Sequence, residues 1–120
     1  MNALNLKEAQ YSPKVVLNKK DGIFEISGRS LPEDSEELFA PVLAWFKEYF
    51  QSPNPTTIFS IRLQYFNSAT AKIIFGLMHT MQSVPGASIE WCYQHDDEDM
   101  LETGQEFESE LTVPFTFKEI

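Results

Sequence analysis

The sequence predicts a single α/β domain over residues 1–120, with about three helices on a mixed sheet of about five to six strands. Segments with the apolar–polar pattern of strands are followed in turn by segments with helical periodicity. Short turn signals separate them, and there is neither an internal repeat nor a low-complexity linker. A length of 120 residues, 42% of them hydrophobic, is sufficient for one core.

The first elements predicted are a hairpin and a helix. The apolar runs Val15–Leu17 and Ile23–Ser27 flank an Asp-Gly turn, which predicts two antiparallel strands. Pro41 lacks an N–H group and is disfavoured inside a helix, so we expect a turn over residues 33–40 and a helix over Pro41–Phe50. Asp34 or Ser35 is a suitable N-cap near this turn. One apolar face is predicted from Leu38, Val42, Trp45, Phe46 and Tyr49.

The second half alternates strands with helices. Thr56–Phe66 carries large side chains on both faces, with Phe59, Ile61, Leu63 and Tyr65 on one of them, so we expect a central strand covered on each side. Asn67 and Ser68 are cap residues, and Ala69–Gln82 has helical periodicity. The remaining predicted elements are a strand over Ala87–Tyr93, a helix from a cap at Asp96 or Asp97 to about Glu108, and a strand over Leu111–Phe117. Because Pro114 cannot donate a hydrogen bond, we expect this last strand to lie at a sheet edge or to contain a bulge.

The charge and the cysteine content exclude several classes of protein. A net charge of −9, from 18 acidic and 9 basic side chains, disfavours binding to nucleic acid or to an anionic membrane. The single cysteine, Cys92, excludes an intramolecular disulfide. The sequence has neither a secretory signal at its start nor an apolar run approaching the roughly 18 residues of a membrane-spanning helix, so we expect a cytoplasmic protein.

Several candidate sites have simpler structural interpretations. The acidic run over residues 96–99, with further glutamates to 110, lacks the pattern of a calcium loop and is typical of a helix start and a solvated face, although an acidic docking surface remains open. Cys92, His95 and His79 are weak candidates for a metal site, and a buried structural cysteine is more usual. Motifs of hydrolases and nucleotide-binding enzymes are missing. We therefore predict no catalytic residue, metal or cofactor.

Aromatic residues near the first helix are either core or a partner groove. Most of the 10 phenylalanines need burial, but Phe39 and Phe50 fall near the edges of the apolar stripe. We therefore keep Phe39 as a candidate partner contact.

Ser68 is the most informative position, because it follows a predicted central strand and opens a helix. Backbone N–H groups at such a junction have no helical partner. The residue could serve only as a cap, but a phosphate placed there would gain the dipole and the free donors. It would add roughly −1.5 to −2 charges without disrupting the fold.

Two motifs resemble those of the SiaC family of bacterial regulatory phosphoproteins. Residues 63–72 read Leu-Gln-Tyr-Phe-Asn-Ser-Ala-Thr-Ala-Lys, similar to the family's Leu-x-Tyr-(Phe/Leu)-Asn-(Thr/Ser)-Ser-Ser-x-Lys. Residues 28–39 read Gly-Arg-Ser-Leu-Pro-Glu-Asp-Ser-Glu-Glu-Leu-Phe, similar to Gly-x-Ser-x-Pro-Glu-(Asn/Asp)-Ser followed by a phenylalanine, and Val113-Pro114-Phe115 also fits. The resemblance covers roughly residues 12–117.

The resemblance implies a STAS-like sandwich, related to anti-sigma-factor antagonists, and a non-enzymatic role. In the family, a kinase phosphorylates the hydroxyl residue after the asparagine, a PP2C-type phosphatase removes the phosphate, and the unphosphorylated form activates a diguanylate cyclase. By position, the phosphosite is Ser68, with Thr70 as the second choice, and partner contacts include Asn67, Ser68, Ala69 and Lys72. The chain departs from the best-known members in having Ser68 for threonine and Ala69 for a hydroxyl residue. An anti-sigma-factor antagonist and a small metal-binding domain are the alternatives.

Overall fold

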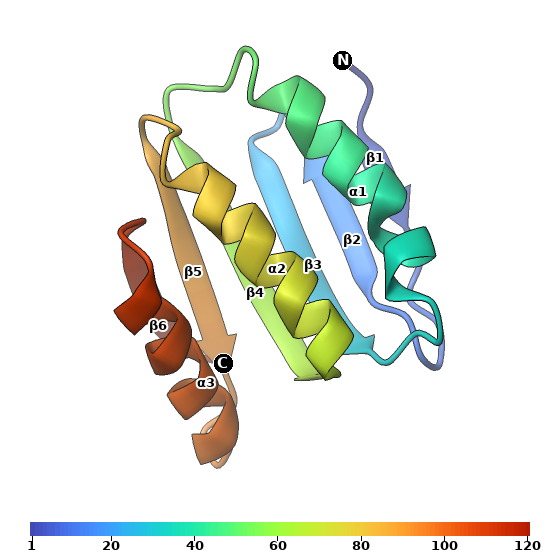
Figure 1. The fold of residues 1–120 in the computed structure, drawn as a ribbon, viewed down its shortest axis with the longest axis vertical. Helices are drawn as coiled ribbons and strands as arrows, with labels where there is room; N and C mark the ends of the chain where they lie inside the picture. The colour runs from blue at the N-terminus through green and yellow to red at the C-terminus, as the bar shows by residue number, and fades with distance from the viewer.

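The computed structural model describes all 120 residues as one six-stranded mixed sheet and three helices (Figure 1). The predicted order of elements is confirmed, with one short strand added at the N-terminus. In chain order the elements are β1 (Leu4–Leu6), β2 (Lys14–Asn18), β3 (Ile23–Ser30), α1 (Ser35–Tyr49), β4 (Thr57–Phe66), α2 (Ser68–Met81), β5 (Ala87–Tyr93), α3 (Glu98–Glu110) and β6 (Phe115–Glu119). None of the helices is both long enough and apolar enough to span a membrane.

The strands lie in the sheet in the order in which they occur in the chain. β1, β2 and β3 are antiparallel, whereas β3, β4, β5 and β6 are parallel and are joined through α1, α2 and α3. Successive right-handed crossovers that all advance in the same direction place their helices on one face of a sheet. Figure 1 shows this arrangement, with the helices in front of the strands.

The core therefore fills only the space between the helices and one face of the sheet. In β4, Phe59, Ile61 and Leu63 are buried on this face, while Ile58 on the other face is 48% exposed. The expectation that β4 is covered on each side is wrong, because no connection of this topology crosses to the second face. That face instead carries polar contacts, such as those of Arg62 with Glu25 and Glu90.

A bulge near the end of β4 reverses the faces predicted for its last residues. Gly28 pairs with Leu63 but Arg29 pairs with Tyr65, so Gln64 is an extra residue in β4. Tyr65, which we expected on the same face of the strand as Leu63, is 55% exposed. Phe66 packs edge-on against Trp91, with ring centroids 6.1 Å apart. The bulge thus determines which way the last side chains of β4 point just before α2 begins.

α1 begins six residues earlier than the sequence predicts and contains Pro41 in its interior. Asp34 is the N-cap, and its carboxylate accepts a hydrogen bond from the N–H of Glu37 (3.0 Å). Extending the helix to Ser35 also buries Phe39. The cap, at about 1 kcal/mol, and a buried phenylalanine, at about 1.5–3 kcal/mol, offset the roughly 3 kcal/mol that an interior proline costs.

The other element boundaries agree more closely with the prediction. Asn67 caps α2, and Asp97 caps α3 by accepting from the N–H of Met100 (3.0 Å). β6 is an edge strand, as Pro114 indicates, but it starts only after that residue. The upstream residues predicted as strand include Leu111 and Val113, which are buried in the α3–β6 connection instead.

Candidate functional site

Ser68 lies at the edge of the sheet where the parallel strands β3 and β4 end and the helices α1 and α2 begin. It is the first residue of α2 and its side chain is exposed. The first turns of α1 and α3 contain acidic residues, but the first turn of α2 contains none. The positive end of the α2 dipole is therefore open to an added negative charge at this position.

A hydrogen-bond network that is buried at Ser30 and Thr70 holds the junction that carries Ser68. The N–H of Asn67 donates to the Ser30 carbonyl (3.0 Å), and the Asn67 side chain accepts from the N–H of Thr70 (2.9 Å). The hydroxyls of Ser30 and Thr70 lie 2.8 Å apart, and both residues are 0% exposed. The Thr70 hydroxyl is thus sealed from an external enzyme, whereas that of Ser68 is accessible.

We expect Thr70→Val to lower the free energy of unfolding by about 1–3 kcal/mol, because it leaves the Ser30 hydroxyl buried without its partner. The double variant Ser30→Ala, Thr70→Val removes both hydroxyls, so its loss should be smaller than the sum of the single losses. Urea unfolding of the four proteins measures this coupling. Additive losses would show that the two hydroxyls do not interact.

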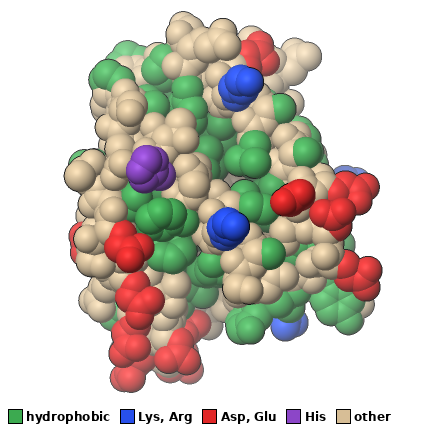
Figure 2. Space-filling view, in the orientation of Figure 1, with side chains coloured by type: hydrophobic (Ala, Val, Ile, Leu, Met, Phe, Trp, Pro, Cys, Tyr) green, Lys and Arg blue, Asp and Glu red, His purple; other side chains and the backbone are tan.

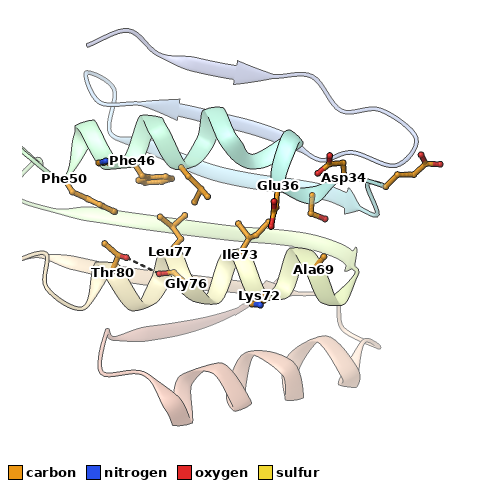
Figure 3. Close-up of a pocket in the computed structure, with 14 residues that line it drawn as sticks. Asp34, Glu36, Phe46, Phe50, Ala69, Lys72, Ile73, Gly76, Leu77 and Thr80 are labelled. Carbon is orange, nitrogen blue, oxygen red and sulfur yellow. Dashed lines mark hydrogen bonds between the residues drawn. The ribbon is translucent and has the colours of Figure 1, made fainter.

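A groove of about 840 Å³ lies between α1 and α2, next to this junction. Its apolar lining includes residues from both helices, and Leu43 among them is 39% exposed. Figure 2 shows hydrophobic side chains along the seam between the two helices, with acidic side chains on its α1 side. In Figure 3, Asp34 and Glu36 lie at the same end as Ala69 and Lys72, while Phe50 and Thr80 lie at the other.

The structure gathers most of the predicted contact residues but not Phe39. Asn67 and Ser68 form the start of α2, and Ala69 and Lys72 line the groove beside them. Phe39 is only 2% exposed, because it points into the core between α1 and the sheet. Its prediction as a partner contact is wrong, and Phe50, the other aromatic residue at the edge of the stripe, lines the groove instead.

The residues considered for metal binding are not brought together. Cys92 is buried on the sheet face opposite the helices, and desolvation raises the pKa of its thiol. His79 is exposed on α2, and His95 is exposed in the β5–α3 turn, where it contacts Glu119. No group of three or more His, Cys, Asp or Glu side chains in the chain has the geometry to hold a metal ion. The metal-site hypothesis gains no support from this arrangement.

The acidic run behaves as a helix start and a solvated face. Asp97 is the cap of α3, and Glu98 and Asp99 occupy its first turn, where the helix dipole favours negative charge. The later glutamates of α3 are exposed, and acidic side chains follow this helix in Figure 2. They lie away from the groove between α1 and α2.

A hydrogen bond to Glu119 raises the pKa of His95 above the ordinary histidine value of 6.5. This pair stabilises the folded state fully below the pKa of His95 in the unfolded chain, and the contribution is lost as pH rises through the folded pKa. Raising the pH from about 5 to about 8 should therefore lower the free energy of unfolding slightly more in the wild-type protein than in the His95→Gln variant. Urea midpoints at low salt test this, and identical pH profiles would contradict it.

Ser30 and Ser35 are two residues of the junction whose roles no sequence pattern predicts. Ser30 pins the start of α2 through its hydroxyl and its carbonyl, and Ser35 lines the groove with a buried hydroxyl that has no hydrogen-bond partner. Both occur in the segment over residues 28–39 that resembles the family motif. The motif therefore marks the segment that contains both residues, but it does not predict which atoms they contact.

Comparisons with known proteins agree with the motifs. A family model described as SiaC family regulatory phosphoprotein matches residues 6–120. An uncharacterized protein of Pseudomonas aeruginosa (strain UCBPP-PA14) is 24% identical over 122 residues, covering 98% of this chain and 97% of that protein. SiaC of Pseudomonas aeruginosa has a similar structure, with a TM-score of 0.87, 23% identity and coverage of 100% of both chains.

A second solved structure contains a complex. It is the crystal structure of the diguanylate cyclase SiaD with its activator SiaC from Pseudomonas aeruginosa, and the match has a TM-score of 0.90 at 24% identity, covering 98% of this chain and 99% of that chain. These likenesses show that the present chain has the same fold.

Proposed function

The chain belongs to the SiaC family of regulatory phosphoproteins, and from this premise we propose that it is a non-enzymatic adaptor switched by phosphorylation of Ser68. In its unphosphorylated form it binds and activates a diguanylate cyclase, which raises cyclic-di-GMP. A Ser/Thr kinase adds the phosphate and a PP2C-type phosphatase removes it. The switch operates in the cytoplasm, where the nucleotide substrates of these enzymes are found.

The observation that carries the proposal is an exposed serine at a helix start that hydrogen bonds hold beside an apolar groove. A kinase needs access to the Ser68 oxygen, which attacks the γ-phosphorus of ATP while the bond to ADP breaks and the hydroxyl proton passes to the kinase. Thr70 offers no such access, since its hydroxyl is buried against Ser30. Of the two candidate phosphosites, only Ser68 therefore meets this requirement.

The position of Ser68 explains how a phosphate there can change the affinity for an effector without unfolding the protein. The new charge lies in solvent at the positive end of α2, where the free N–H groups and the dipole accommodate it. Asn67, Ala69 and Lys72 surround it, and Ala69 and Lys72 also line the groove. An effector seated there meets added bulk and roughly −1.5 to −2 charges.

The choice of a diguanylate cyclase as effector rests on family membership and on the structurally similar SiaC, which is an activator of SiaD. The apolar groove is a suitable surface for such a partner, because unpaired apolar area on a monomer is typical of interaction sites. Asn67 and Ser68 extend this surface with polar groups.

Phosphosite mapping after incubation with the cognate kinase and ATP tests the proposal. The expected result is a single phosphate on Ser68 in the wild type and none in Ser68→Ala, with Thr70→Ser as a control that stays modified at Ser68 alone. Unmodified protein is then used to capture partners from the host lysate. Recovery of a diguanylate cyclase by the unmodified but not the phosphorylated form supports the proposal, whereas recovery of an anti-sigma factor instead would replace the effector.

A further inference from the structure

Lys72 is a cation that lies close to both Ser68 and the α1–α2 groove. It lies four residues after Ser68 on α2, so the two side chains share one face of the helix. Lys72 is exposed, lines the α1–α2 groove and makes no ion pair, since the only ion pairs in the structure are those of Arg62 and His95. It is thus able to interact both with a phosphate on Ser68 and with a molecule in the groove.

The end of the groove that holds Lys72 also contains unused hydrogen-bond donors. The first turn of α2 has free N–H groups and no acidic residue. The buried Ser35 hydroxyl, which also has no partner, lies on the opposite side of the groove, at the start of α1. Across the groove, the α1 side presents the acidic residues Glu33, Asp34 and Glu36. At this end of the groove the two rims therefore have opposite charge, and the α2 rim is the one suited to a carboxylate.

We propose that Lys72 is the cation through which a phosphate on Ser68 releases the effector. In the unmodified protein its ammonium group binds a carboxylate of an effector segment whose apolar side chains occupy the groove and whose basic side chains face the α1 rim. In the phosphorylated protein the same ammonium group pairs with the phosphate. This inference rests on the proposed function, and it adds the chemistry of the contact and of its release.

Lys72 pairs with the phosphate in preference to the effector's carboxylate for two reasons. It carries roughly −1.5 to −2 charges against −1 for a carboxylate, and it belongs to the same helix, at the i, i+4 spacing at which opposite charges attract. Once Lys72 is withdrawn, the effector's carboxylate is left unpaired beside a new negative charge. Loss of an attraction and gain of a repulsion act together, so one modification has a large effect on affinity.

The first test needs neither kinase nor effector. Phosphoserine is installed at position 68 during synthesis of the chain, and the second ionisation of the phosphate is followed by ³¹P NMR. A neighbouring ammonium group favours the dianion, so the phosphate pKa should be roughly 0.3–0.7 units higher in Lys72→Met than in the wild type. Lys47→Met, which removes the lysine in the last turn of α1 at the other end of the groove, should leave it unchanged.

The second test measures the affinity of the unmodified variants for the cyclase. Lys72→Met should weaken binding by roughly 5–20-fold, Lys72→Arg should bind nearly as the wild type does, and Lys47→Met should have a smaller effect than Lys72→Met. Full affinity in Lys72→Met, or a phosphate pKa that ignores Lys72, overturns the inference. The proposed function fails separately, if the phosphorylated and unmodified wild-type proteins bind the cyclase equally.

Discussion

Replacing Ser68 with aspartate is expected to weaken binding to the effector at least about tenfold, or ~1.4 kcal/mol, while changing the free energy of unfolding by no more than about 0.5 kcal/mol. The side chain is exposed, and Asn67 rather than Ser68 caps α2, so the fold does not depend on the hydroxyl. A carboxylate at the first position of a helix is favoured by the dipole. Isothermal titration with the cyclase and thermal unfolding measure the two quantities.

Ser68→Ala is the matched control for this prediction. It removes the hydroxyl without adding charge, so it should bind the effector as the unmodified protein does and should resist inactivation by the kinase. If Ser68→Asp instead lost stability and kept its affinity, Ser68 would have only a structural role at the helix start.

Trp91→Ala is expected to lower the free energy of unfolding by about 3–5 kcal/mol, the largest effect of any substitution considered. Trp91 is 0% exposed, its indole N–H donates to the Met100 carbonyl (2.9 Å), and its ring packs against Phe66 and Phe107. A Cβ atom added at Gly104 would lie only 2.6 Å from this ring, which shows how closely α3 approaches it. Urea unfolding followed by far-ultraviolet circular dichroism measures the loss.

Tyr65→Ala is the control for the effect of removing a large aromatic side chain. Tyr65 is also in the sheet but is 55% exposed, so its removal should cost about 1 kcal/mol or less. Equal losses for Trp91→Ala and Tyr65→Ala would contradict a central role of the buried Trp91 in packing α3 against the sheet.

Local patterns predicted the elements well where a single physical signal dominated. Asn67 is predictable as a cap because its side chain can satisfy an N–H group of the next turn, which it does for Thr70. Pro41 misled the prediction of α1, because its local cost is outweighed by the burial of Phe39 and by the cap at Asp34. That balance depends on tertiary packing, which a local pattern does not contain.

Long-range structure limited the prediction of faces and of the site. The open face of β4 follows from crossovers that all advance in one direction, and the position of Tyr65 follows from a bulge opposite Gly28 and Arg29. The strand-to-helix junction and the motif both point to Ser68, but its distinction from Thr70 depends on Ser30, which lies 40 residues before Thr70. The groove was likewise invisible, since it is formed by two helices that strand β4 separates in the chain.

The most direct test is the rate of cyclic-di-GMP synthesis by the cyclase in the presence of this protein. The unmodified protein and protein stoichiometrically phosphorylated on Ser68 are titrated against the same enzyme. We predict a concentration-dependent rise in rate with the unmodified protein, little or no rise with the phosphorylated protein, and recovery after treatment with a PP2C-type phosphatase. Equal activation by both forms would contradict the assignment of Ser68 as the switch.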